Sequence, residues 1–326
     1  MRVVRVTGFG GPEVLVPGEA PEPVAGPGQV VVEASAIDVI FVETQIRSGW
    51  GGEYFTVEPP YVPGGGVAGQ VVAVGADVDP TWLGRRVLAR AEGGGYAERV
   101  VASAAGLVPV PDELDLRDAA ALLHDGPTAM GLMDVVGVRR GETVLVNAAA
   151  GGMGILLVQL ARAAGARVIG AARGERKLAL VRELGAEAVD YTEPGWVERV
   201  RELAGGDGVD VVLDGAGGEI GRAAFDVVAP GGRFSAHGAP SGGFAPIDQE
   251  QARRRNVRLT GIEKVQFSPE EITRLATRAV DAAAAGRIRP VIGRTFPLAE
   301  AAEAHAVVEA RAVVGKTLLL TGSTTS

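Results

Sequence analysis

The sequence predicts an α/β protein with two domains, one rich in short β-strands and one built on a doubly wound parallel sheet. Short valine-rich segments separated by glycine and proline turns fill the first third of the chain, and strands and helices alternate from Glu142 onward. A length of 326 residues suits two domains, and 47% hydrophobic residues provide for a large core.

The first part is expected to form a barrel-like domain, because many short strands at close spacing are typical of barrels. Turns such as Ala25-Gly26-Pro27-Gly28 and Pro63-Gly64-Gly65-Gly66 separate the strands. The strand candidates are residues 3–6, 30–36, 67–74, 86–90 and 97–103.

Beyond residue 142, the alternation indicates βαβ units and hence a parallel sheet covered on both faces. Six strands suit a doubly wound dinucleotide-binding fold. The strand candidates are residues 143–147, 167–171, 188–191, 209–213, 232–236 and 258–262, and helices are expected to begin near Gly152, Glu175, Pro194, Glu219 and Gln249.

The C-terminal segment is expected to return to the first domain. A helix begins at Ser268-Pro269-Glu270-Glu271, which offers an N-cap, a proline at the first helical position and acids in the first turn. A strand (291–296), a helix (298–310) and a strand (316–321) follow. The predicted domains are therefore residues 1–123 with 266–326, and residues 124–265.

The composition argues against nucleic-acid and membrane partners. The net charge is −8, and the basic run Arg253-Arg254-Arg255 is interpreted as a solvated helix face. No apolar run approaches the roughly 20 residues that span a bilayer, and charges interrupt the N-terminus where a signal peptide needs an apolar core. The chain has no cysteine, which excludes disulfides, thiolate catalysis and cysteine-ligated zinc. We expect a cytoplasmic location.

The strongest chemical signal is a turn of small residues between a buried strand and a helix, at residues 147–154. Aligned with the dinucleotide fingerprint, Ala149, Gly151 and Gly154 take the three small-residue positions. A side chain at Gly151 would keep a pyrophosphate from the backbone N–H groups and the helix N-terminus, and one at Gly154 would push the helix off the strand. The predicted binding residues here are Ala149, Ala150, Gly151, Gly152, Met153 and Gly154.

The next strand decides between NADH and NADPH. An NADH site places an acid about 20 residues past the turn, where it holds the ribose hydroxyls. Arg173 and Lys177 stand there instead, and a 2′-phosphate requires cationic partners. Tyr191, at the end of the following strand, is a further candidate for the same phosphate. Surface charges are the alternative interpretation, but the pattern favours NADPH.

With these residues in place, the chain resembles the zinc-independent quinone oxidoreductase (zeta-crystallin-like) branch of the medium-chain dehydrogenase/reductase family. The resemblance runs from end to end, through the segments 10–15, 43–49, 149–154 and 315–317. It implies a GroES-like catalytic domain made from both chain ends, a Rossmann domain between them, NADPH as the cofactor, and a homodimer. It also places Lys177 and Tyr191 at the 2′-phosphate and Thr128 near the nicotinamide.

The zinc alcohol dehydrogenases share this implied fold, but this sequence lacks the residues of their zinc site. Their catalytic metal needs a cysteine, a Gly-His-Glu element and another histidine or cysteine, whereas the matching place here reads Gly64-Gly65-Gly66. A catalytic zinc needs about three protein ligands. The three histidines lie far apart in the sequence, and His305, in an alanine-rich helix, is interpreted as structural. No metal is expected.

No dedicated acid or base is obvious. The family usually places an asparagine near the nicotinamide, and the matching residue here is Ile40, which puts ordinary quinone activity in doubt. The weak catalytic candidates are His124 and Asp125 as proton donor or relay, Gln45 as a nearby polar group, and Tyr54 at the substrate mouth. Helix capping or packing is the alternative for His124 and Asp125. Phe234 and His237 end a strand at the edge where ligands bind in such folds, which makes them cofactor candidates.

The leading hypothesis is an NADPH-dependent oxidoreductase that transfers hydride to a quinone or an α,β-unsaturated carbonyl compound. An enoyl thioester reductase of a biosynthetic pathway is an open alternative. A non-catalytic NADPH-binding protein is a second alternative, from another class, and RNA binding would need a basic patch that the acidic balance disfavours.

Overall fold

The computed structural model describes residues 1–52 and 55–322, and these form two compact units. Unit 1 comprises Met1–Pro127, Pro269–Ala285 and Pro290–Ser326, and unit 2 comprises Thr128–Ser268 with Gly286–Arg289. These divisions fall at 127/128 and 268/269, a few residues beyond the expected boundaries at 123/124 and 265/266.

Unit 1 is built on a sheet with the strand order β14-β15-β3-β4-β5-β7, in which β6 also pairs with β3. A separate antiparallel pair, β1 and β2, completes its strands. The strands are β1 (Arg2–Val6), β2 (Leu15–Glu19), β3 (Gln29–Val39), β4 (Gly66–Val74), β5 (Arg86–Arg90), β6 (Arg99–Ser103), β7 (Val108–Pro109), β14 (Ile292–Pro297) and β15 (Lys316–Leu320).

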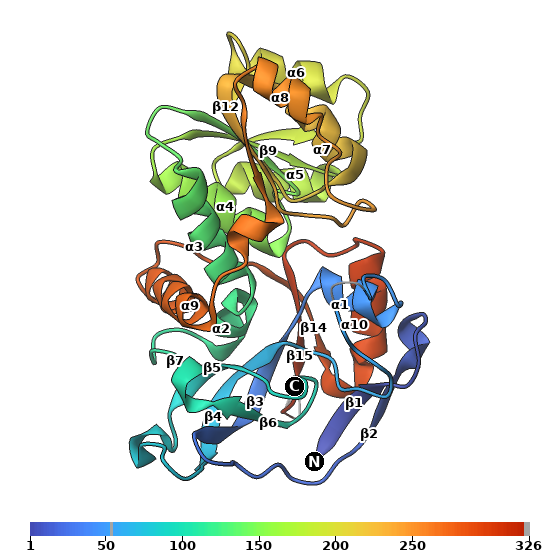
Figure 1. Ribbon diagram of the computed structural model, residues 1–326, viewed down its shortest axis with the longest axis vertical. Helices are drawn as coiled ribbons and strands as arrows, with labels where there is room; N and C mark the ends of the chain where they lie inside the picture. The colour runs from blue at the N-terminus through green and yellow to red at the C-terminus, as the bar shows by residue number, and fades with distance from the viewer. Residues whose placement is uncertain (53–54, 323–326) are drawn as a thin grey trace. The chain divides into compact units, whose positions relative to one another are not determined.

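The C-terminal return is confirmed, because β15 pairs antiparallel with the second half of β3. Figure 1 shows β14 and β15, from the red end of the chain, beside the blue β3. Helices α1 (Phe41–Arg47), α2 (Leu116–Leu122), α9 (Pro269–Ala284) and α10 (Ala301–Glu309) belong to this unit. The segment expected as one helix over 298–310 divides into a 3-10 turn, Leu298–Glu300, and α10.

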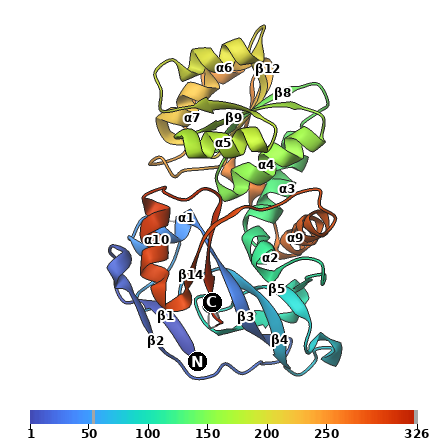
Figure 2. The same cartoon turned by 180° about the vertical axis from the view of Figure 1, so that it is seen from behind.

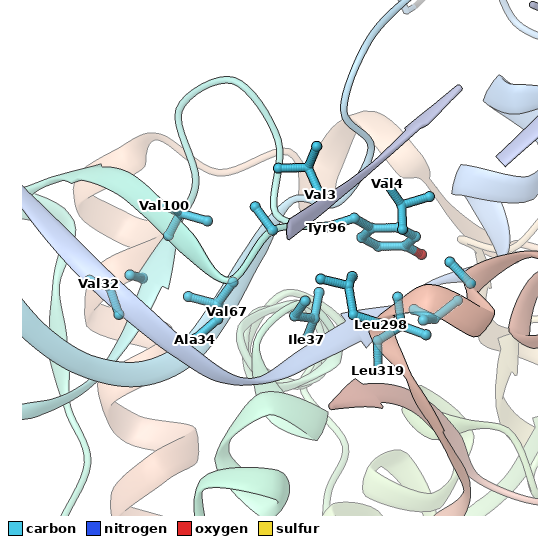
Figure 3. Close-up of a cluster of buried hydrophobic side chains, with 14 of the residues drawn as sticks. Val3, Val4, Val32, Ala34, Ile37, Val67, Tyr96, Val100, Leu298 and Leu319 are labelled. Carbon is cyan, nitrogen blue, oxygen red and sulfur yellow. The ribbon is translucent and has the colours of Figure 1, made fainter. Parts of the chain in front are cut away.

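Alternation of apolar residues along the strands produces the core of unit 1. Val32 and Ala34 of β3 meet Val67 of β4 and Val100 of β6 on one buried face, and Leu319 of β15 extends it (Figure 3). Strand β2 was not predicted, because Pro17 and Gly18 interrupt its sequence. The proline is tolerated because, among the described strands, β2 pairs with β1 alone. Pro17 therefore does not have to form hydrogen bonds to a second neighbouring strand.

Unit 2 contains a six-stranded parallel sheet with the order β10-β9-β8-β11-β12-β13, as a doubly wound fold requires. The strands are β8 (Thr143–Asn147), β9 (Arg167–Ala172), β10 (Glu187–Asp190), β11 (Val209–Asp214), β12 (Val228–Ala236) and β13 (Arg258–Gly261). All six predicted strands are present, and β12 begins four residues early.

Helices cover both faces of this sheet (Figure 2). The helices are α3 (Asp125–Val136), whose first turn belongs to unit 1, α4 (Gly152–Ala163), α5 (Glu175–Glu183), α6 (Trp196–Ala204), α7 (Gly218–Phe225) and α8 (Gln249–Arg254). Val200 of α6, Phe225 of α7 and Ala252 of α8 share one core cluster with the sheet. Further 3-10 turns are Pro12–Val14, Pro80–Trp82, Ala104–Gly106 and Ile262–Val265.

Candidate functional site

The turn after β8 has the backbone geometry of a phosphate cradle. Ala148 adopts a φ of 54°, a left-handed conformation that is costly for a residue with a Cβ and is concentrated at functional turns. Helix α4 then begins at Gly152 with Gly151 as its N-cap, and no side chain caps its first N–H groups. These donors therefore point toward the position that an anion would occupy.

The two glycines of this turn differ in what a side chain would meet. A Cβ on Gly154 would lie 2.2 Å from the Ala148 carbonyl oxygen and 2.8 Å from the Ala149 Cα, so the helix can approach the strand only without it. Among the described residues, apart from its two chain neighbours, a Cβ on Gly151 would meet just one atom, the Ala148 oxygen at 3.3 Å. The fold therefore requires Gly154, whereas Gly151 leaves space that none of residues 1–52 and 55–322 fills.

The other small residues of the turn have packing roles. Ala149 and Ala150 are buried, and the Ala149 N–H donates to the Ala171 carbonyl. Gly152 and Met153 are half-buried in the first turn of α4.

The residues expected at the 2′-phosphate lie around the C-terminal ends of β9 and β10. Arg173 is exposed directly after β9, Lys177 is half-buried in the first turn of α5, and the half-buried Tyr191 follows β10. The Tyr191 N–H donates to the Ala172 carbonyl, which ties the two strand ends together.

Asp190, the acid that ends β10, is engaged by backbone groups. Its carboxylate accepts from the Gly174 N–H at 2.7 Å and from the N–H and hydroxyl of Thr192. Desolvation opposes these bonds, yet they hold the pKa of Asp190 below its ordinary value, with a contribution from the Arg173 guanidinium. Asp190 therefore orders the loops rather than offering a free acceptor to a ribose.

At the middle of the same edge, Asp214 joins the end of β8 to the turn that follows β11. Its buried carboxylate accepts from the Asn147 amide at 2.9 Å and from the N–H groups of Ala216 and Gly217. Desolvation raises the pKa of Asp214. This residue was not predicted, although an acid that ends an apolar strand is the signal that could have found it.

The strand-end candidates Phe234 and His237 receive different roles. Phe234 is 1% exposed, and its ring packs edge-on against Phe225, so its side chain belongs to the core rather than to a ligand site. His237 lies against Gly215, with Nε2 at 3.4 Å from the position of a Cβ there. Desolvation lowers the pKa of His237 to about 4, so its imidazole is neutral near pH 7. Thr128 is half-buried in α3.

Unit 1 contains a second feature, a buried network of four charged or titratable side chains. Lys316 forms ion pairs with Asp38 at 2.6 Å and with Asp125 at 3.0 Å, and His124 Nδ1 lies 3.0 Å from the second oxygen of Asp38. Asp38 is fully buried and Lys316 is 5% exposed, whereas the side chains of His124 and Asp125 are 18% and 19% exposed. We call these residues the Asp38 network.

The topology of unit 1 explains how these residues meet. Asp38 of β3 is paired with Leu318 of β15, so Lys316, two residues earlier, is its diagonal neighbour on the same face. His124 and Asp125 lie just beyond the C-cap of α2, a helix that packs against β3 and β15. Burial alone raises the pKa of Asp38, but Lys316 and His124 hold that pKa below its ordinary value. Burial lowers the pKa of Lys316, and the two carboxylates more than offset it.

A second buried polar group lies next to this network. The Tyr96 hydroxyl donates to Glu43 at 3.0 Å and lies 2.8 Å from His305 Nε2. Desolvation raises the pKa of Glu43 to about 7 and lowers that of His305 to about 3. Arg47, 1% exposed, pairs with Glu309, which makes it a structural anchor for α1.

The remaining catalytic candidates are Gln45 and Tyr54. Gln45 is half-buried on α1, and Ile40 caps that helix with a backbone N–H donated to Glu43. Tyr54 lies outside the described residues.

No group of three or more potential metal ligands occurs within residues 1–52 and 55–322. Over the same stretches, every helix is too short or too polar to cross a membrane. Gly65 instead leaves room for the His124 ring, because a Cβ there would lie 2.3 Å from Nε2.

Comparisons with known proteins agree with this architecture. The family model of the alcohol dehydrogenase GroES-like domain matches residues 26–112, and that of the zinc-binding dehydrogenases matches residues 152–280. A 2-haloacrylate reductase from a Burkholderia species is 36% identical over 320 residues, covering 95% of this chain and 96% of that one. A quinone oxidoreductase from Pseudomonas aeruginosa is 35% identical over 324 residues, covering 97% and 98%. The solved Escherichia coli quinone oxidoreductase, complexed with NADPH, is 28% identical with a TM-score of 0.90, covering 98% and 100%.

Proposed function

The chain belongs to the quinone oxidoreductase (zeta-crystallin-like) branch of the medium-chain dehydrogenase/reductase family, and from that premise we propose that it is an NADPH-dependent, zinc-independent reductase of conjugated carbonyl compounds. The substrate class comprises quinones and α,β-unsaturated carbonyl compounds. A homodimer located in the cytoplasm is part of the proposal.

The observation that carries the proposal is the space over Gly151. A Cβ at that position would meet no more than one backbone oxygen at 3.3 Å, in a turn whose uncapped N–H groups begin α4. A residue that the fold does not need as glycine, at the place where a pyrophosphate must approach the backbone, fits the dinucleotide. When bound, NADPH supplies the hydride and its two electrons.

The choice of NADPH rests on the ends of β9 and β10. Arg173 and Lys177 bring two positive charges to this edge, and Tyr191 brings a hydroxyl. The acid that would compete for them, Asp190, is committed to the Gly174 and Thr192 backbone. An extra phosphate is favoured by such cations, whereas a 2′-hydroxyl gains little from them.

Zinc independence rests on the residues that replace metal ligands. The sequence has no cysteine, and Gly64-Gly65-Gly66 has no side chain that could ligate a metal. The imidazole next to Gly65 is already bound to Asp38 through Nδ1. Activation of a substrate carbonyl would then depend on hydrogen-bond donors and protons from the protein.

Reduction of a carbon–carbon double bond is a second form of the same proposal, and the 2-haloacrylate reductase among the relatives favours it. An enoyl thioester falls in this class. Ile40, in place of the family asparagine, argues against a substrate that needs an amide partner at that position.

The test measures NADPH oxidation against 1,4-benzoquinone, a simple enone, 2-chloroacrylate and crotonyl-CoA, with NADH in parallel. We expect turnover with at least one acceptor class and a lower KM for NADPH than for NADH. Tight NADPH binding without turnover on any acceptor would overturn the proposal in favour of a non-catalytic NADPH-binding protein. Addition of a chelator should leave turnover unchanged, and its loss would overturn zinc independence.

A further inference from the structure

We propose that His124 is the proton donor of the reduction and that Asp38, held by Lys316, is its positioning residue. This inference rests on the proposed function. Hydride addition to the β-carbon of a conjugated carbonyl compound moves the π-electron pair toward the carbonyl and leaves an enolate. The enolate must gain one proton, so an acid within reach would accelerate the step.

The three histidines of the chain differ in their surroundings. His305 and His237 have pKa values lowered by desolvation to about 3 and about 4, so neither carries a transferable proton near pH 7. His124 is partly exposed and hydrogen-bonded to a carboxylate that Lys316 keeps ionised. Because that carboxylate accepts, Nδ1 of His124 is the donor, and the second ring nitrogen, Nε2, is directed away from Asp38.

The ion pairs of the Asp38 network leave an excess of negative charge beside His124. Asp38 and Asp125 contribute two negative charges, and Lys316 contributes one positive charge. Glu43, a further acid that interacts electrostatically with His124 and Asp38, is bonded to Tyr96, and desolvation raises its pKa to about 7, so it adds little charge in weakly acidic solution.

The other members of the network are unsuited to be the acid. Asp38 is fully buried, and both Asp38 and Asp125 accept from the Lys316 ammonium in ion pairs, so neither is placed to donate a proton. His124 is next to Gly65, a residue whose missing side chain allows the ring to lie there while 18% of it stays exposed. We therefore assign Nε2 as the atom that transfers the proton, and Nδ1 as the atom that anchors the ring by its hydrogen bond to Asp38.

The Nε2–H bond of the imidazolium breaks and its electron pair stays on nitrogen, while a C–H bond forms at the substrate α-carbon. The hydride from NADPH has supplied the two electrons, and the neutral imidazole regains one proton from water. With a quinone the proton goes to a phenolate oxygen, which is a far more stable anion and gains less from an acid.

The experiment compares wild type with His124→Gln, which keeps a polar side chain of similar reach but cannot donate as an acid. We expect kcat with the enone to fall roughly 10²- to 10⁴-fold, kcat with the quinone to fall much less, and the Kd for NADPH to stay unchanged. Asp38→Asn should shift the pH profile of kcat with the enone, a result that a purely structural role would not give. Gly65→Ala should displace the ring and reproduce the enone-specific loss.

A measurement without turnover supports the assignment independently. The histidine Cε1 proton signals of the wild-type protein, followed by NMR from pH 5 to 9, should include one that moves, and this signal should be missing in His124→Gln. If no histidine signal moves, or if His124→Gln keeps the enone rate and pH profile, the donor assignment is overturned. If the wild-type protein reduces no acceptor, the proposed function fails and the donor assignment fails with it.

Discussion

The replacement of Gly151 by alanine should separate cofactor binding from folding. In the structure the new Cβ would lie 3.3 Å from the Ala148 oxygen, a contact that a shift of a few tenths of an ångström relieves. The backbone of Gly151 has φ −84° and ψ 168°, which alanine adopts without strain. Alanine is a poorer N-cap than glycine, so we expect a loss of about 1 kcal/mol in the free energy of unfolding.

The effect on the cofactor should be much larger. The Cβ holds a pyrophosphate away from the α4 N–H groups, and each lost hydrogen bond to a charged group costs about 1.5–3 kcal/mol. One such bond corresponds to a Kd higher by about 10- to 150-fold, and the loss should be equal for NADPH and NADH. Titration calorimetry for both cofactors, with thermal unfolding of the free protein, measures the two effects separately.

Gly154→Ala is the matched control. Its Cβ would lie 2.2 Å from the Ala148 oxygen, where relief requires movement of the backbone. We expect a stability loss of about 1–3 kcal/mol from overpacking, with binding reduced as a consequence. A Gly151→Ala protein that binds NADPH as tightly as wild type would refute the reasoning, because the space over Gly151 would then not be the pyrophosphate site.

Two further predictions concern charge. Arg173→Ala combined with Lys177→Ala should weaken NADPH binding by about 10- to 100-fold and leave NADH binding nearly unchanged. As a control, alanine in place of the exposed Arg176 on the same helix should leave the binding of both cofactors unchanged. Equal losses for NADPH and NADH would overturn the assignment of these residues to the 2′-phosphate. Glu43→Gln should alter the pH dependence of stability. The folded pKa of Glu43, about 7, lies above its ordinary 4.5, so its stabilising contribution is complete below pH 4.5 and is lost as pH rises through 7. Between pH 4 and pH 8, the free energy of unfolding of the variant should therefore rise by about 3 kcal/mol relative to that of wild type. Chemical denaturation of both proteins at the two pH values measures this difference. A difference that does not change with pH would contradict the prediction.

The parts of the fold that depend on local pattern could be predicted from the sequence. The turn at 147–154 needs only a strand, small residues and a helix in succession, and the structure has β8, the turn and α4 where they were expected. Strand β2 escaped prediction because Pro17 and Gly18 are poor strand formers, and pairing with β1 along one edge overrides that preference.

The Asp38 network could not be assembled from the sequence, because its members come from positions 38, 124, 125 and 316. Their meeting depends on the antiparallel pairing of β15 with β3, and a shift of one residue in that register would turn Lys316 to the opposite face. The available signal was an ionisable residue within the apolar segment Ala36-Ile37-Asp38-Val39, since a buried charge requires a partner. A buried Asp38 indicates that a partner of opposite charge exists, but the sequence does not say which residue it is.

The three histidines show why residue type alone does not assign a role. His305 and His237 are desolvated without a carboxylate partner, and the cost of burying a charge keeps both rings neutral. His124 has an ionised carboxylate at 3.0 Å and retains contact with solvent. The same imidazole is therefore a hydrogen-bonding group in two places and a candidate acid in the third. The difference arises from Asp38, and so from Lys316, which the C-terminal strand brings back to the first unit.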